Sequence, residues 1–103
     1  KKIIINQNKL NKFSEEKITN LNYVYLDRSV NISDKKLFYN NKNIEYIKCK
    51  YEYMNYFNLK QIKSITLIEE SDKFVLDLEK FKLCQNLEIL SITLSISKIV
   101  FFK

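Results

Sequence analysis

One spacing of apolar residues recurs along the chain and constrains its fold more than any other feature. Three segments carry apolar side chains at successive intervals of three, three and two residues. They are Ile18, Leu21, Val24 and Leu26; Leu59, Ile62, Ile65 and Leu67; and Cys84, Leu87, Leu90 and Ile92. A fourth copy, formed by Asn41, Ile44, Ile47 and Cys49, begins with asparagine instead. An internal repeat of this kind predicts one structural unit used several times.

The repeated spacing resembles the leucine-rich-repeat family, in irregular form, because the family's last apolar pair lies on a short strand. The copies are anchored on Leu21, Ile44, Ile62 and Leu87. Their intervals are close to the family's period of about 20 to 29 residues, and only the middle one is short. The chain departs from the family in lacking glycine and proline and in having no Asn or Cys in register after the strand.

The resemblance implies an α/β fold, a short leucine-rich-repeat-like solenoid with about four to five strands on its concave face and short helices on its convex face. The alternative is a compact α+β domain in which the same strands pair antiparallel. The length of 103 residues fits a single domain spanning 1–103.

Apolar residues followed by aromatic ones predict the short helices between the strands. These pairs are Leu10 and Phe13, Leu37 and Phe38, Met54 and Phe57, and Leu78 and Phe81. Residues 3–5 predict an additional strand before the first copy, and residues 96–102 predict a segment that covers the open end of the sheet.

Strand alternation predicts which side chains form the concave face, because neighbouring side chains of a strand point to opposite faces. If Val24 and Leu26 enter the core, Tyr23, Tyr25 and Asp27 point outward. The same register in the other copies adds Tyr46, Lys48, Lys50, Ser64, Thr66, Ile68, Ile89, Ser91 and Thr93. We predict that these residues bind a partner, with the three tyrosines as anchors, since tyrosine is enriched among residues that dominate binding energy. The alternative is that the tyrosines serve only as strand formers on a solvated sheet.

The residue types present argue against catalysis. Without histidine the chain has no Ser-His or Cys-His pair, and without glycine it has no phosphate-cradling loop. Cys49 and Cys84 fall within the apolar pattern and are predicted to be reduced core residues, so we expect no metal site and no cofactor. We predict that the protein is not an enzyme.

A net charge of +6 raises nucleic acid as an alternative partner. The lysine-rich neighbourhood of Tyr51, Tyr53, Tyr56 and Phe57 could stack bases. However, Arg28 is the only arginine, and the richness in Lys, Asn and Ile is typical of an AT-rich genome. The alternative function is therefore a nucleic-acid-binding protein, or an inhibitor of a nucleic-acid-processing enzyme.

No apolar run approaches the roughly 20 residues of a membrane span, so we expect a cytoplasmic protein with no membrane partner. The opening Lys1-Lys2-Ile3 is typical of a bacterial reading frame whose initiator Met has been removed, which indicates a complete small protein. We predict a non-catalytic protein-binding module: an inhibitor, immunity protein or adaptor of bacterial or mobile-element origin.

Overall fold

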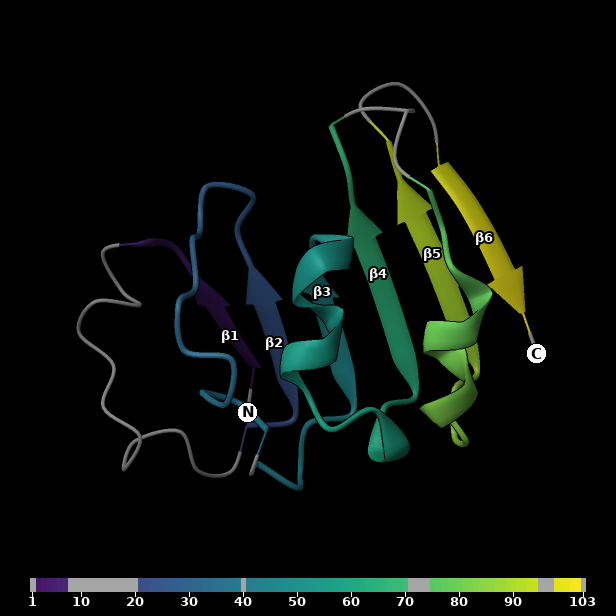
Figure 1. Cartoon of the computed structure of the whole chain (residues 1–103), viewed down its shortest axis with the longest axis horizontal. Coiled ribbons are helices and arrows are strands. Elements are labelled where there is room, and N and C mark those ends of the chain that lie inside the picture. The colour runs from purple at the N-terminus through teal and green to yellow at the C-terminus, as the bar shows by residue number, and fades with distance from the viewer. Residues whose placement is uncertain (1, 8–20, 40, 71–74, 95–97, 103) are drawn as a thin grey trace.

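A computed structural model describes residues 2–7, 21–39, 41–70, 75–94 and 98–102, the last range for its backbone only. The chain forms one six-stranded sheet with short 3-10 helices between some of the strands (Figure 1). The strands are β1 (Lys2–Ile5), β2 (Tyr23–Leu26), β3 (Tyr46–Cys49), β4 (Ser64–Ile68), β5 (Ile89–Thr93) and β6 (Lys98–Phe102). The helices are η2 (Tyr51–Tyr56), η3 (Leu59–Gln61) and η4 (Leu78–Leu83).

The strands lie in the sheet in the same order as in the sequence. β1 to β5 are parallel, and β6 turns back to pair antiparallel with β5. Parallel neighbours need a crossover connection between them, and η2, η3 and η4 lie in these connections on one side of the sheet (Figure 1). The architecture is α/β, with a parallel sheet of five strands. The extra strand predicted at residues 3–5 is present as β1, and β6 covers the far edge of β5.

Side chains from alternate strand positions form the core between the sheet and the helices. All the predicted inward positions are buried: Val24, Leu26, Ile47, Cys49, Ile65, Leu67, Leu90 and Ile92. Met54 lies within η2, and Phe57 directly follows this helix. Both side chains pack against this layer and are 0% and 1% exposed. Burial of each such side chain stabilises the fold by roughly 1.5–3 kcal/mol before the entropy of ordering is counted.

The helical predictions need correction in two places. Residues 35–39 form turns rather than a helix, and within them Phe38 is buried and stacks on Phe57 at a centroid distance of 5.1 Å. In η4, Leu78 is 71% exposed, so it does not share the partly buried position of Phe81. The predicted pair Leu10 and Phe13, and Ile18 of the first repeat, lie outside the described residues.

Side-chain amides connect successive crossover segments. The Gln61 amide nitrogen donates to the carbonyl oxygens of Asn41 and Ile44 at 2.8 and 3.0 Å. The Asn86 amide nitrogen donates in the same way to the carbonyl oxygen of Lys60 at 2.8 Å. Gln61 and Asn86 each immediately precede an anchor residue of the repeat, Ile62 and Leu87. In these two copies, the residue before the anchor therefore bonds to the backbone of the preceding unit.

Candidate binding surface

The face of the sheet opposite the helices is the candidate site. No helix in the described part of the chain covers this side (Figure 1). We use the term open face for the side chains of β1 to β5 that alternate away from the core. They are Lys2, Ile4, Tyr23, Tyr25, Tyr46, Lys48, Ser64, Thr66, Ile68, Ile89, Ser91 and Thr93.

A stacked tyrosine pair lies in the first row across the open face. The sheet register aligns Lys2, Tyr23 and Tyr46 on neighbouring strands. The rings of Tyr23 and Tyr46 stack at 6.1 Å with an angle of 21° between their planes, and the Lys2 ammonium lies 4.6 Å from the Tyr23 ring centroid. Tyr46 is 38% exposed. The pair is therefore held in place by its neighbours while part of its surface remains available.

The second row places a lysine over a tyrosine. Ile4, Tyr25 and Lys48 are aligned by the register, and the Lys48 Nζ atom lies 4.5 Å from the Tyr25 ring centroid. Ile4 is 52% exposed. A lysine side chain that rests on a ring loses less rotamer entropy when it meets a partner, which is the advantage of a preorganised contact.

A shared backbone pattern fixes this register at the amino ends of the strands. The amide groups of Glu45 and Tyr46 both donate to the Asn22 carbonyl oxygen. The pairs Lys63–Ser64 and Glu88–Ile89 repeat the pattern, donating to the carbonyl oxygens of Glu45 and Lys63 respectively. Each strand is thus set against its predecessor in the same way, which keeps the outward residues in continuous rows.

Charges of both signs line this end of the open face. The Lys63 ammonium lies 2.7 Å from a carboxylate oxygen of Glu45. That hydrogen bond and the attraction of the Glu45 charge raise the pKa of Lys63. Because both side chains are solvent-accessible, the pair contributes little to stability. The Glu45 carboxylate also places a negative charge among the lysines at this end of the sheet.

The carboxyl ends of the strands surround a hollow of about 270 Å³. Its lining comes from four separate parts of the chain: Tyr25, Arg28, Lys48, Ile68, Glu69, Thr93 and Leu94. Ile68 is buried, while Arg28 is exposed in the turn after β2. Carboxyl ends of parallel strands are a common place for ligand sites in α/β folds.

The structure brings together most of the sequence-predicted binding residues, with four exceptions. Asp27 lies just beyond β2, where its carboxylate accepts from the Ser29 amide at 3.1 Å, and Lys50 lies beyond β3 as the residue preceding η2. Ile68 and Ser91 occupy outward register positions but are only 6% and 7% exposed. These four residues offer little side-chain surface on the open face.

Three residues of the surface were missed from the sequence. Lys2 and Ile4 extend the two rows onto β1, and the alternation of Lys2-Ile3-Ile4-Ile5 with the later strands was the signal that could have placed them. Arg28 lies in a turn, where period-two alternation no longer applies, and only the tertiary structure places it beside Lys48 in the hollow.

The aromatic segment after β3 does not form a base-stacking platform. Tyr53 and Phe57 are buried, and the Tyr53 hydroxyl donates to the Val30 carbonyl oxygen at 3.1 Å. Tyr51 is half-buried; its ring lies beneath the Lys80 ammonium, and its hydroxyl accepts from the Asp77 amide at 2.8 Å. These rings are thus engaged in the core and in holding the loop before η4.

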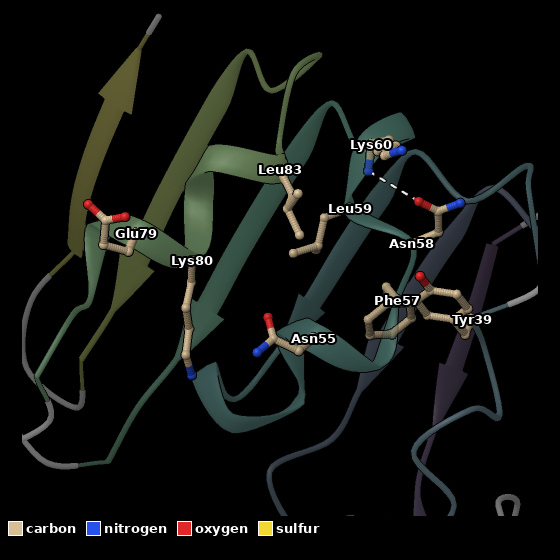
Figure 2. A pocket seen from close by; sticks show the side chains of 9 residues that line it. All are labelled: Tyr39, Asn55, Phe57, Asn58, Leu59, Lys60, Glu79, Lys80 and Leu83. Carbon is tan, nitrogen blue, oxygen red and sulfur yellow. Dashed lines mark hydrogen bonds between the residues drawn. The ribbon is translucent and has the colours of Figure 1, made fainter.

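A second hollow, of about 230 Å³, lies on the helical side (Figure 2). Leu59 of η3 and Leu83 of η4 point toward one another across it, and Tyr39 and Phe57 lie at one end (Figure 2). Leu83 is 57% exposed and Tyr39 is 51% exposed. This side carries isolated apolar residues rather than aligned rows.

No family model, curated protein or solved structure matches the chain. Among the described residues, no group of three or more Cys, Asp or Glu side chains could hold a metal ion. Over the same ranges, no helix has the length and apolar character needed to cross a membrane. The function must therefore be argued from the open face itself.

Proposed function

We propose that the chain is a non-catalytic protein-binding module, a short leucine-rich-repeat-like solenoid that docks a protein partner on its open face. The stacked pair of Tyr23 and Tyr46 carries this proposal. Rigid, partly exposed tyrosines supply a large contact area at low entropic cost, and such residues dominate the energy of protein interfaces.

The charge pattern supports a protein rather than a nucleic acid as partner. Lys2 and Lys48 lie over tyrosine rings on the open face. Glu45, Glu69 and Glu88 adjoin the ends of strands β3, β4 and β5 of the same sheet. A nonspecific single-strand binder usually follows the phosphates with a continuous positive groove. A mixed, tyrosine-rich surface instead fits a protein of complementary shape. Small modules of this kind act as inhibitors, immunity proteins or adaptors, and the proposal is of such a protein, of bacterial or mobile-element origin, acting in the cytoplasm.

The test is affinity capture by the tagged chain from a lysate of its host, with and without nuclease treatment. We expect a discrete protein to be retained by the natural sequence and lost with the double variant Tyr23→Ala, Tyr46→Ala. An interface hot spot of about 2 kcal/mol or more per residue corresponds to an affinity loss of at least roughly 30-fold for each tyrosine.

The matched control is Tyr39→Ala, which removes a tyrosine that is 51% exposed on the helical side. It should leave capture unchanged. Circular dichroism and urea unfolding of each variant separate loss of binding from loss of fold. If only nucleic acid is recovered, and binding weakens steeply as the salt concentration increases, the protein-binding proposal is wrong and the alternative of a nucleic-acid-binding protein holds.

A further inference from the structure

The hollow at the carboxyl ends of the strands is lined by two cations, Arg28 and Lys48. Neither of them forms an ion pair with another residue that the structure describes. The two come from different parts of the chain, the turn after β2 and strand β3, and the fold alone brings them to one hollow. Two cations that line a small concave site and have no carboxylate partner among the described residues indicate an anionic ligand.

The turn that carries Arg28 is braced on both sides. The Asp27 amide donates to the Ile5 carbonyl oxygen at 2.9 Å, and the Val30 amide donates back to the Asp27 carbonyl oxygen at 3.0 Å. The Asp27 carboxylate also accepts from the Ser29 amide at 3.1 Å. Arg28 therefore projects from an ordered turn, which lowers the entropic cost of using its guanidinium group.

Glu69 also lines the hollow, but part of its carboxylate is already used. One of its oxygens accepts from the Tyr51 amide at 2.7 Å, while the Glu69 amide donates to the Thr93 carbonyl oxygen at 2.9 Å. With Arg28 and Lys48 opposite one anion, the lining retains a net positive charge. Glu69 limits that charge to what a single carboxylate can neutralise.

We propose that this hollow receives an aspartate or glutamate side chain of the protein partner, with Arg28 binding the carboxylate through its planar fork and Lys48 approaching as a second cation. This inference rests on the proposed function. At about 270 Å³ the hollow is below the roughly 300–1,000 Å³ of sites that bury a drug-sized ligand, and this volume suits a single side chain. The apolar Ile68 and Leu94 in the lining fit the methylene groups of that side chain.

The test uses a capped tetraglutamate peptide as the probe, titrated into the isotope-labelled full chain and followed by NMR. We expect shifts centred on the amides of Arg28, Lys48 and Thr93, with none for a tetraglutamine peptide. Arg28→Gln should weaken peptide binding about tenfold, in line with the loss of a charged hydrogen bond. Glu69→Gln keeps the acceptor for the Tyr51 amide while removing the opposing charge, so it should strengthen binding.

The control Lys42→Gln removes one positive charge from a turn before β3, at the opposite end of the strands, and should leave affinity within twofold. Shifts spread over all lysines, absence of shifts at the hollow, or equal displacement by inorganic phosphate or oligothymidylate would each overturn the carboxylate site. If a captured protein depends on Tyr23 and Tyr46 but not on Arg28, the proposed function stands and only this inference fails.

Discussion

At the scale of single residues, the same outward strand position has different consequences in different parts of the sheet. Tyr46 is 38% exposed and keeps a free surface, whereas Ser91, also in an outward position, is 7% exposed. Tyr25 is intermediate because Lys48 covers its ring. Alternation states which side of the sheet a residue belongs to, but neighbouring side chains decide how much of it a partner can reach.

We expect the buried thiol of Cys49 to make the stability of the protein decrease at alkaline pH. Its thiol is fully buried, and burial first, then the nearby Glu69 carboxylate, raise its pKa above the ordinary value of 9.0. The folded protein then keeps a proton that the unfolded chain releases. The contribution of Cys49 to the free energy of unfolding is therefore complete below pH 9.0 and decreases as the pH rises beyond that value. We expect the free energy of unfolding in urea to fall as the pH rises from about 9 to 10.5, and to fall less in Cys49→Ala.

The slopes of the free energy of unfolding against pH, compared between the natural chain and Cys49→Ala, give the contribution of the Cys49 thiol alone. Lys63 does not interfere, because its raised pKa keeps the ammonium charged at and beyond its ordinary value of 10.5, and its ion pair with Glu45 is present in both proteins. Cys49→Ala is less stable at neutral pH because it leaves a small cavity. Parallel pH profiles for the two proteins would show that Cys49 makes no linked contribution.

At the scale of elements, the crossover segments between β2 and β5, as far as the structure describes them, are short 3-10 helices and turns. In a 3-10 helix, residues three apart lie in line, so the spacing of Met54 and Phe57 fits this geometry as well as an α-helix. Side-chain caps begin two of the three described helices: Asn58 accepts from the Lys60 amide, and Asp77 accepts from the Glu79 amide. These caps satisfy amide groups that have no partner within so short a helix.

We expect the partly buried side chain of Gln61 to have a large effect on the stability of the fold. Because its nitrogen bonds to both the Asn41 and Ile44 carbonyl oxygens, Gln61→Ala removes two hydrogen bonds between neighbouring segments. We expect a loss of about 1–3 kcal/mol in the free energy of unfolding, measured with urea. The neighbouring exposed variant Lys60→Ala should change it by no more than about 0.5 kcal/mol. Equal effects of the two variants would contradict a role for this amide.

At the scale of the whole molecule, sequential parallel strands make each unit depend on its neighbours. β1 to β5 follow one another in order, and β6 reverses direction beside β5. A sheet built in this way presents an edge wherever it stops, and unprotected edges pair with other chains. The antiparallel β6 therefore acts as the cover of the β5 edge.

Removal of β6 tests this role. A chain ending at Leu94 leaves the edge formed by Ile89–Thr93 unpaired, so we expect concentration-dependent self-association in sedimentation experiments that the full chain does not show. A second form with charged substitutions at the outward positions Ile89 and Thr93 should suppress that association. A truncated chain that stays monomeric with unchanged stability would show that β6 is dispensable.

The sequence by itself determined the positions of the strands and their inward residues, because the repeated apolar spacing assigns Val24, Ile47, Ile65 and Leu90 to one face of the sheet. It left open whether these strands pair parallel or antiparallel, and the structure shows parallel pairing. The sequence also indicated the tyrosine surface, since a period of two assigns every strand side chain to a face. The predicted helix around Phe38 was wrong because one apolar and one aromatic residue fit a packed turn equally well.

Only the tertiary structure decided what depends on contacts between distant segments. It stacked Tyr23 on Tyr46, placed Arg28 beside Lys48 in one hollow, and buried Ser91 within its outward row. Turns carry no periodic signal, and the exposure of a side chain depends on neighbours far away in the chain. The physical reason is that local spacing assigns a residue to a face of its own strand, whereas a binding site is formed by packing among several strands and turns.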